Sequence, residues 1–150
     1  MVIPNLGQPG GRGRRARVRT MQKLRIASSQ FPVTEDISRN ARFVRRYMIK
    51  ASIFGAHLLH TSEACLSGYA GVDFTSFNGF DWDLLRKETS RCRILAADLG
   101  IWLILGSAHF LDNRTKPANC LYVFDPKGRI VDRYDKSMCT VGDQKAYSAG

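Results

Sequence analysis

Two charged residues lie where the chain leaves predicted strands, and their types and positions make them the first candidates for chemistry. Glu63 follows an apolar run and precedes a loop of small residues, Ser67-Gly68-Tyr69-Ala70-Gly71. A strand fixes the carboxylate, and a glycine-rich turn lets the backbone curve around a substrate. Lys136 ends a later strand, in the run Tyr134-Asp135-Lys136. Paired with a buried carboxylate, such a lysine stays protonated and stabilises developing negative charge.

Each of the two residues also has an ordinary structural interpretation. A glutamate or a lysine at a strand end is commonly a solvated surface charge. The 73 positions between Glu63 and Lys136 do not show that the two residues meet. The elements that position them therefore matter.

The residues before Glu63 are typical of a strand–helix–strand unit. Residues 24–31 predict a strand closed by Pro32, which cannot donate to a ladder. Thr34 or Asp36 can cap the helix that follows, and Gly55 ends it. That helix has a single apolar stripe at spacings of four and three residues, formed by Ile37, Ala41, Val44, Met48 and Ala51. This order favours parallel strands with the helix over one face.

The residues after the Glu63 loop predict a second helix, a buried strand and a hairpin. The helix runs from Asp81 to about Leu99, and Gly100 is placed to end it. The buried strand covers residues 101–107. The hairpin strands cover 119–124 and 129–134, with a turn of Asp125-Pro126-Lys127-Gly128 between them. Cys92 lies in the apolar pattern of the helix, and Cys120 lies in that of the first hairpin strand. Both are therefore expected to be core residues.

The composition is that of one globular domain. The chain has 150 residues, 44% hydrophobic and 24% charged. No apolar run approaches the ~20 residues that a membrane span needs, so no membrane partner is expected. The net charge is +10, but residues 1–20 hold five arginines and no acid, which accounts for half of it. We expect residues 1–20 to be a disordered Arg/Gly-rich tail and 21–150 to form the domain.

The tail has two functional interpretations, and its composition favours neither. No aromatic residue is interleaved to stack on bases, which disfavours nucleic acid as a partner. The tail has no serine and carries glycine and proline, which disfavours a transit peptide. A tail without function is the preferred interpretation. A non-catalytic basic binding module that uses the tail on acidic surfaces stays open as an alternative.

The cysteines and histidines give no signal for a metal or a cofactor. The four cysteines form no CxxC pair, and the three histidines show no ligand spacing. Neither a G-x-G-x-x-G nor a P-loop motif occurs. We therefore expect no metal and no cofactor. With no signal peptide, reduced thiols in the cytoplasm are the expectation.

Taken in order, the motifs of the chain resemble those of the nitrilase superfamily of carbon–nitrogen hydrolases. From about Leu24 to Gly150 the chain reads Gln-Phe-Pro, Glu-x-x-x-Ser-Gly-Tyr, Leu-Gly-Ser, Asn-x-Leu-Tyr-Val-Phe, Asp-Pro-x-Gly and Tyr-Asp-Lys. The resemblance implies an α/β fold, the α-β-β-α sandwich, of which this chain would be the N-terminal part. It also implies hydrolysis of small amides, carbamoyl compounds or nitriles, and a homo-oligomer for the full-length family.

The resemblance assigns roles to three residues. Glu63 matches the general base, which deprotonates the thiol of a Glu–Lys–Cys triad. Lys136 matches the cation that steadies the tetrahedral intermediate. Asp143 is the nearest match to a second acid that follows the lysine. Ser62 departs from the pattern, because the family usually has proline before the base.

No cysteine matches the family's nucleophile. Cys65 and Cys139 lie near Glu63 and Lys136 but in the wrong motifs. The nucleophile of the family lies on a later strand, beyond Gly150. We therefore expect a truncated chain that is inactive alone, or half of a split enzyme that pairs with another polypeptide. We also expect Glu63 and Lys136 to lie close together, at the ends of neighbouring strands.

Overall fold

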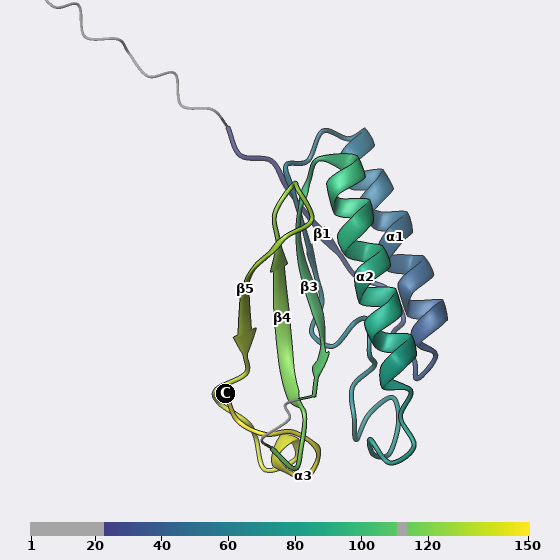
Figure 1. The fold of residues 1–150 in the computed structure, drawn as a ribbon, viewed down its shortest axis with the longest axis vertical. Coiled ribbons are helices and arrows are strands. Elements are labelled where there is room, and N and C mark those ends of the chain that lie inside the picture. The colour runs from purple at the N-terminus through teal and green to yellow at the C-terminus, as the bar shows by residue number, and fades with distance from the viewer. Residues whose placement is uncertain (1–22, 111–113) are drawn as a thin grey trace, which may run out of the picture.

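The computed structural model describes residues 23–110 and 114–150, which fold around one five-stranded sheet (Figure 1). The tail expected at residues 1–20 lies outside the described residues. The elements in chain order are β1 (Ile26–Ser29), α1 (Ile37–Ile53), β2 (Leu58–Thr61), α2 (Trp82–Leu99), β3 (Trp102–His109), β4 (Ala118–Phe124), β5 (Ile130–Asp135) and α3 (Asp143–Ala146).

The pairing directions bring the ends of β2 and β5 to the same edge of the sheet. The strands lie in the order β1-β2-β3-β4-β5. β1, β2 and β3 are parallel, whereas β4 is antiparallel to both β3 and β5. β5 therefore runs in the same direction as β2, with two strands between them. The segments that follow β2 and β5 leave the sheet at one edge, although they are not neighbours.

The two long helices form as their sequence patterns predict and cover the same side of the sheet (Figure 1). The five residues of the apolar stripe on α1 are each at most 5% exposed. Asp36 caps this helix, because its carboxylate accepts a hydrogen bond from the Arg39 amide at 2.9 Å. Gly100 ends α2 with a φ of 63°, the left-handed conformation that glycine adopts without strain.

The core lies between the helices and the sheet. Leu103 and Phe124 are partners in the β3–β4 register, and both are fully buried. Burial of each such side chain contributes roughly 1.5–3 kcal/mol to folding. Cys92 and Cys120 are also buried, as their patterns predicted. The turn that joins β4 and β5 closes through a hydrogen bond from the Gly128 amide to the Asp125 carbonyl at 2.9 Å.

The opposite side of the sheet, here called the open face, has no covering helix among residues 23–110 and 114–150 (Figure 1). Side-chain alternation and strand register assign seven large apolar residues to it: Ile26, Leu58, Trp102, Ile104, Leu121, Val123 and Tyr134. Ile26 is 57%, Trp102 38% and Tyr134 54% exposed. An apolar sheet face of this kind is typical of a surface that packs against a second layer.

We predict that the chain self-associates through the open face. At about 10 µM it is expected to sediment as a dimer or larger species, and Trp102→Lys is expected to shift it towards the monomer. Lysine places a charge in the contact, which disfavours apolar packing. Ile94→Lys is the matched control, because Ile94 is 53% exposed on α2, away from this face. A monodisperse wild-type monomer would contradict the prediction.

Candidate active site

Glu63 lies two residues after β2, in a turn that packs against the middle of β3. Gly106 is the anchor of this turn. Its amide donates to the Thr61 hydroxyl at 3.0 Å, and its carbonyl accepts from the Leu66 amide at 3.0 Å. The turn also places Ala64 at a φ of 50°, a left-handed conformation that costs a non-glycine residue roughly 1–2 kcal/mol. The backbone around Glu63 is therefore held in a constrained path.

Only glycine fits at position 106. A Cβ atom there would lie 2.1 Å from the Ser62 carbonyl oxygen and 2.8 Å from the Ala64 nitrogen. Real Cβ atoms do not approach backbone atoms so closely. The Leu-Gly-Ser run of β3 thus lets the Glu63 turn approach the sheet.

Lys136 follows β5 directly, and its side chain contacts the Glu63 carboxylate. The Lys136 ammonium lies 2.9 Å from Glu63 Oε1. The expected proximity is therefore present, but the expectation of neighbouring strands is wrong, because β3 and β4 lie between β2 and β5. The two residues meet because both strands point to the same sheet edge. The Glu63 side chain is 49% exposed and that of Lys136 is 26% exposed.

Asp143 joins the same cluster from the first residue of α3, a four-residue helix that the sequence patterns did not predict. Its carboxylate lies 3.0 Å from the Lys136 ammonium, and its side chain is 3% exposed. The Thr140 amide donates to Oδ2 at 2.8 Å, and the Tyr69 hydroxyl donates to Oδ1. The structure thus brings all three sequence-predicted residues together.

The charges in the cluster stabilise one another. The hydrogen bond to Glu63, helped by Asp143 and Tyr69, raises the pKa of Lys136 well above its usual range, although burial opposes this. The pKa of Asp143 is held well below its usual range, first by the Tyr69 hydroxyl and then by Thr140 and Lys136. At neutral pH the cluster therefore holds a stable ammonium beside a stable carboxylate.

Two further residues contact the cluster, and sequence reasoning assigned neither of them to the site. Asn119, on β4, donates to Glu63 Oε1 at 2.6 Å. The Tyr69 hydroxyl lies 3.3 Å from the Lys136 ammonium. Both residues occur in the motifs quoted above, Asn-x-Leu-Tyr-Val-Phe and Ser-Gly-Tyr. The presence of these two residues in the motifs was the only sequence signal that could have assigned them to the site.

None of the four cysteine side chains forms a hydrogen bond with the side chain of Glu63, Lys136 or Asp143. Cys65, Cys92 and Cys120 are buried, and burial raises their pKa values to about 11, 12 and 12. The Cys139 thiol donates to the Lys136 carbonyl at 3.6 Å and to no side chain of the cluster. That no cysteine of this chain is the nucleophile stays a prediction.

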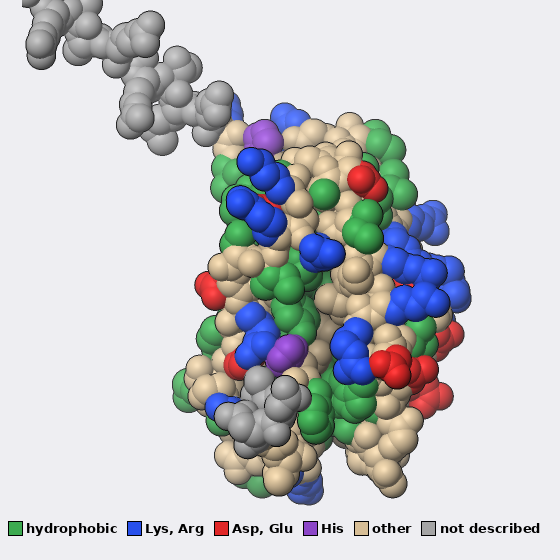
Figure 2. All heavy atoms as spheres, in the orientation of Figure 1, with side chains coloured by type: hydrophobic (Ala, Val, Ile, Leu, Met, Phe, Trp, Pro, Cys, Tyr) green, Lys and Arg blue, Asp and Glu red, His purple; other side chains and the backbone are tan. Residues whose placement is uncertain are grey.

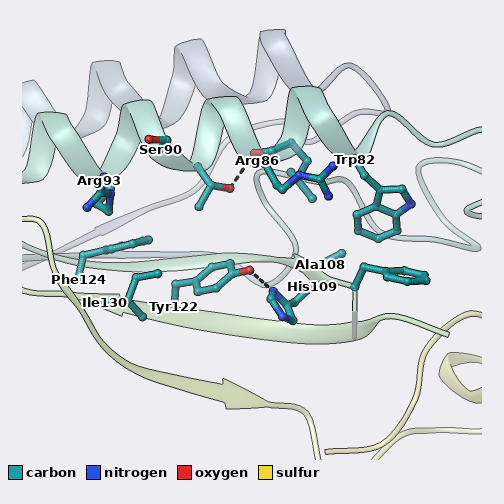
Figure 3. Close-up of a pocket in the computed structure, with 12 residues that line it drawn as sticks. Trp82, Arg86, Ser90, Arg93, Ala108, His109, Tyr122, Phe124 and Ile130 are labelled. Atoms are coloured by element: carbon teal, nitrogen blue, oxygen red, sulfur yellow. Dashed lines mark hydrogen bonds between the residues drawn. The ribbon is translucent and has the colours of Figure 1, made fainter. Parts of the chain in front are cut away.

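A cavity of about 340 Å³ adjoins the cluster and opens beside the open face. Glu63, Lys136, Asn119 and the buried Cys120 border it, together with Leu121 and Tyr134 of the open face. A larger hollow of about 460 Å³ lies on the other side of the sheet, between α2 and strands β3 and β4 (Figures 2 and 3). Apolar and aromatic side chains line much of that hollow, which none of the three candidate residues borders. Because Glu63 and Lys136 border the smaller cavity, it is the better candidate for the place where a substrate would bind.

The described residues contain no group of three or more His, Cys, Asp and Glu side chains arranged to hold a metal ion. Among the same residues, no helix combines the length and the apolar character that crossing a membrane requires.

The carbon–nitrogen hydrolase family model matches residues 25–147. An amidase from Nesterenkonia sp. has a TM-score of 0.72 at 24% identity, over 85% of this chain and 48% of the amidase. A variant of the Nesterenkonia sp. AN1 amidase in complex with butyramide gives the same four values. A search of curated protein sequences finds no match.

A third solved structure is another variant of the AN1 amidase, with the acetamide moiety of fluoroacetamide added covalently at the active site cysteine. It has a TM-score of 0.72 at 23% identity, over 85% of this chain and 48% of that one. These likenesses show a shared nitrilase-type α/β fold. The chain spans about half the length of the solved amidases that it matches.

We predict that Gly106→Ala displaces the Glu63 turn and lowers the free energy of unfolding by roughly 1–3 kcal/mol, the usual cost of overpacking. Urea unfolding measures the change. Gly142→Ala is the control, because a Cβ atom there would have its nearest neighbour at 3.6 Å and the φ of −66° is ordinary. Equal stabilities of the two variants would contradict the close approach at Gly106.

We also predict a specific acid dependence for Asp143. Because its pKa is lower in the folded chain than in the unfolded chain, its contribution to stability is complete above about pH 5 and is lost as the pH falls further. Asp143→Asn lacks this contribution, so the stability gap between the wild type and the variant should narrow between pH 5 and pH 2. Chemical unfolding across that range measures the gap. A gap that does not change with pH would count against the cluster.

Proposed function

Because the chain belongs to the carbon–nitrogen hydrolase family, we propose that it supplies the base and the cation of a site that hydrolyses non-peptide C–N bonds. The substrate class is a small amide, carbamoyl compound or nitrile. The observation that carries the proposal is the 2.9 Å contact between Glu63 and Lys136, residues that follow two strands, β2 and β5, that are not neighbours. A carboxylate and an ammonium in contact beside a cavity are the groups that this chemistry requires.

Each group has one role in the proposed reaction with an amide. A thiol attacks the carbonyl carbon, and its proton passes to the Glu63 carboxylate. The Lys136 ammonium stabilises the negative oxygen of the tetrahedral intermediate. Glu63 then returns the proton to the departing amine, which leaves a thioester. Water attacks the thioester while Glu63 accepts its proton, and the thiol departs with that proton as the carboxylic acid is released.

Asp143 is proposed to keep Lys136 in place and protonated rather than to exchange protons itself. Its carboxylate is buried, accepts hydrogen bonds from Thr140 and Tyr69, and lies 3.0 Å from the ammonium. Its low pKa makes it a poor proton acceptor at neutral pH. A fixed negative charge at this distance favours the ammonium form of Lys136.

The nucleophilic thiol is proposed to come from outside residues 1–150. The buried cysteines have raised pKa values, and the Cys139 thiol points to a backbone carbonyl. A longer chain or a second polypeptide could each supply the thiol. The reaction needs only protein groups and water, so no cofactor is proposed. We further propose that residues 21–150 form the domain, that the protein is cytoplasmic and that it forms a homo-oligomer.

We predict that the 150-residue chain alone hydrolyses none of a panel of amides, N-carbamoyl compounds and nitriles. Without a thiol beside Glu63, no acyl-enzyme forms. Product release measured by liquid chromatography, with the Cys65→Ser and Cys139→Ser variants in parallel, checks this. Turnover by the wild type that either substitution abolishes would show a local nucleophile and contradict the proposal.

A second experiment tests for activity in a longer protein. This protein is the chain extended by the residues encoded directly after Gly150, provided that they supply a strand with a cysteine. The extended protein is expected to hydrolyse a member of the panel. Glu63→Gln in that protein is expected to lower kcat/KM by about 10²–10⁴-fold, the range of general acid–base catalysis. Unchanged kcat/KM in this variant would overturn the role of Glu63.

A further inference from the structure

Asn119 contacts both members of the candidate pair from a single position on β4. Its side-chain amide nitrogen donates to Glu63 Oε1 at 2.6 Å. Its main-chain carbonyl accepts a hydrogen bond from the Lys136 amide at 2.8 Å. The residue is 3% exposed. Asn119 therefore bridges the segments after β2 and β5, which no direct strand pairing connects.

The chemistry of the contact fixes its direction. An ionised carboxylate only accepts hydrogen bonds, so the amide must present its NH₂ group to Glu63. The Lys136 ammonium donates to the same oxygen, Oε1, at 2.9 Å. No residue in 23–110 or 114–150 donates to the second oxygen, Oε2. With Oε1 occupied by two donors, Oε2 is the oxygen left to accept a proton.

We propose that Asn119 is the positioning residue of the site, resting on the proposed function above. Its side chain holds the Glu63 carboxylate in one orientation against Lys136. Its main-chain carbonyl binds the Lys136 amide and so places the lysine within reach of that carboxylate. The strand register supports this arrangement, because Asn119 pairs with Ala108 on β3 and is followed on β4 by Cys120, the partner of Asp135 on β5. Asn119 thus acts through Glu63 rather than on the substrate.

A space-filling role for Asn119 predicts different behaviour. Aspartate has nearly the shape of asparagine, so at a residue that only fills space Asn119→Asp costs no more than the burial of one carboxylate, and Glu63→Gln does not relieve that cost. At a donor to Glu63 the substitution also places two carboxylates against each other, and Glu63→Gln removes this repulsion. Such a pair binds a proton in common, and acidification relieves the repulsion.

The test measures the melting temperature of Asn119→Asp and wild-type chains from pH 8 to pH 4.5. We expect the variant to melt about 10 °C lower at pH 8, the scale of an unpaired buried charge in a domain of this size, and the difference to shrink by at least half at pH 4.5. The reciprocal variant, Asn119→Asp with Glu63→Gln, returns the amide donor from the other side. We expect it to recover most of the loss at pH 8.

Asn40→Asp, alone and with Glu63→Gln, is the matched control. Asn40 is also buried, and its amide donates to the Thr34 carbonyl at 2.6 Å and to the Leu66 carbonyl at 3.4 Å, but not to the Glu63 side chain. Glu63→Gln is expected to give this control no recovery. If Asn119→Asp does not fold at pH 8, recovery of folding in the reciprocal variant still decides the question.

Three results would overturn the proposal: no loss in Asn119→Asp, a loss that does not change with pH, or no recovery in the reciprocal variant. None of these measurements uses catalysis. An extended chain without hydrolytic activity would therefore overturn the proposed function and leave the Asn119 contact intact. An active extended chain together with one of these three results would overturn the role of Asn119 and leave the Glu63–Lys136 pair as the basis of the function.

Discussion

The contact between the Glu63 carboxylate and the Lys136 ammonium is the interaction on which the candidate site depends. The two side chains are 49% and 26% exposed, and an ion pair of that exposure contributes roughly 0–1 kcal/mol to stability. The stability of the ion pair alone therefore does not explain why the close approach at Gly106, the left-handed Ala64 and the hydrogen bond from Asn119 surround it. Positioned charges beside a cavity give a better reason, because preorganised charge is what catalysis requires.

The site and the open face of the sheet are physically connected. The cavity beside the pair is bordered by Leu121 and Tyr134, which belong to the open face. A layer that covers this face would also close the cavity and exclude water from it, which strengthens the electrostatic interactions inside. The described residues supply one sheet and one helical layer of a nitrilase-type fold, and the chain spans about half the length of the solved amidases. A layer over the open face would thus also enclose the candidate site.

The parts of this structure that follow from local patterns were predictable from sequence. The stripe on α1, the Gly100 end of α2 and the β4–β5 turn each rest on residues a few positions apart. The Glu63–Lys136 contact was expected from the order of the motifs, but the strand order was not, because periodicity does not fix how strands are arranged. α3 has only four residues, too few for a helical period to appear. The role of Asn119 depends on register across three strands, which no local pattern contains.

The titration of the Lys136 side chain reports on the Glu63–Lys136 contact, because the hydrogen bond to Glu63 is the largest cause of its raised pKa. Chains labelled with ¹⁵N-lysine would be followed by NMR as the pH rises from 8 towards 12, for the wild type and for Glu63→Gln. We predict that Lys136 keeps its proton to higher pH than a free lysine, whose pKa is about 10.4, and that Glu63→Gln lowers the pKa of Lys136. A Lys136 signal that titrates at the free-lysine value and does not respond to Glu63→Gln would contradict a contact between the two side chains.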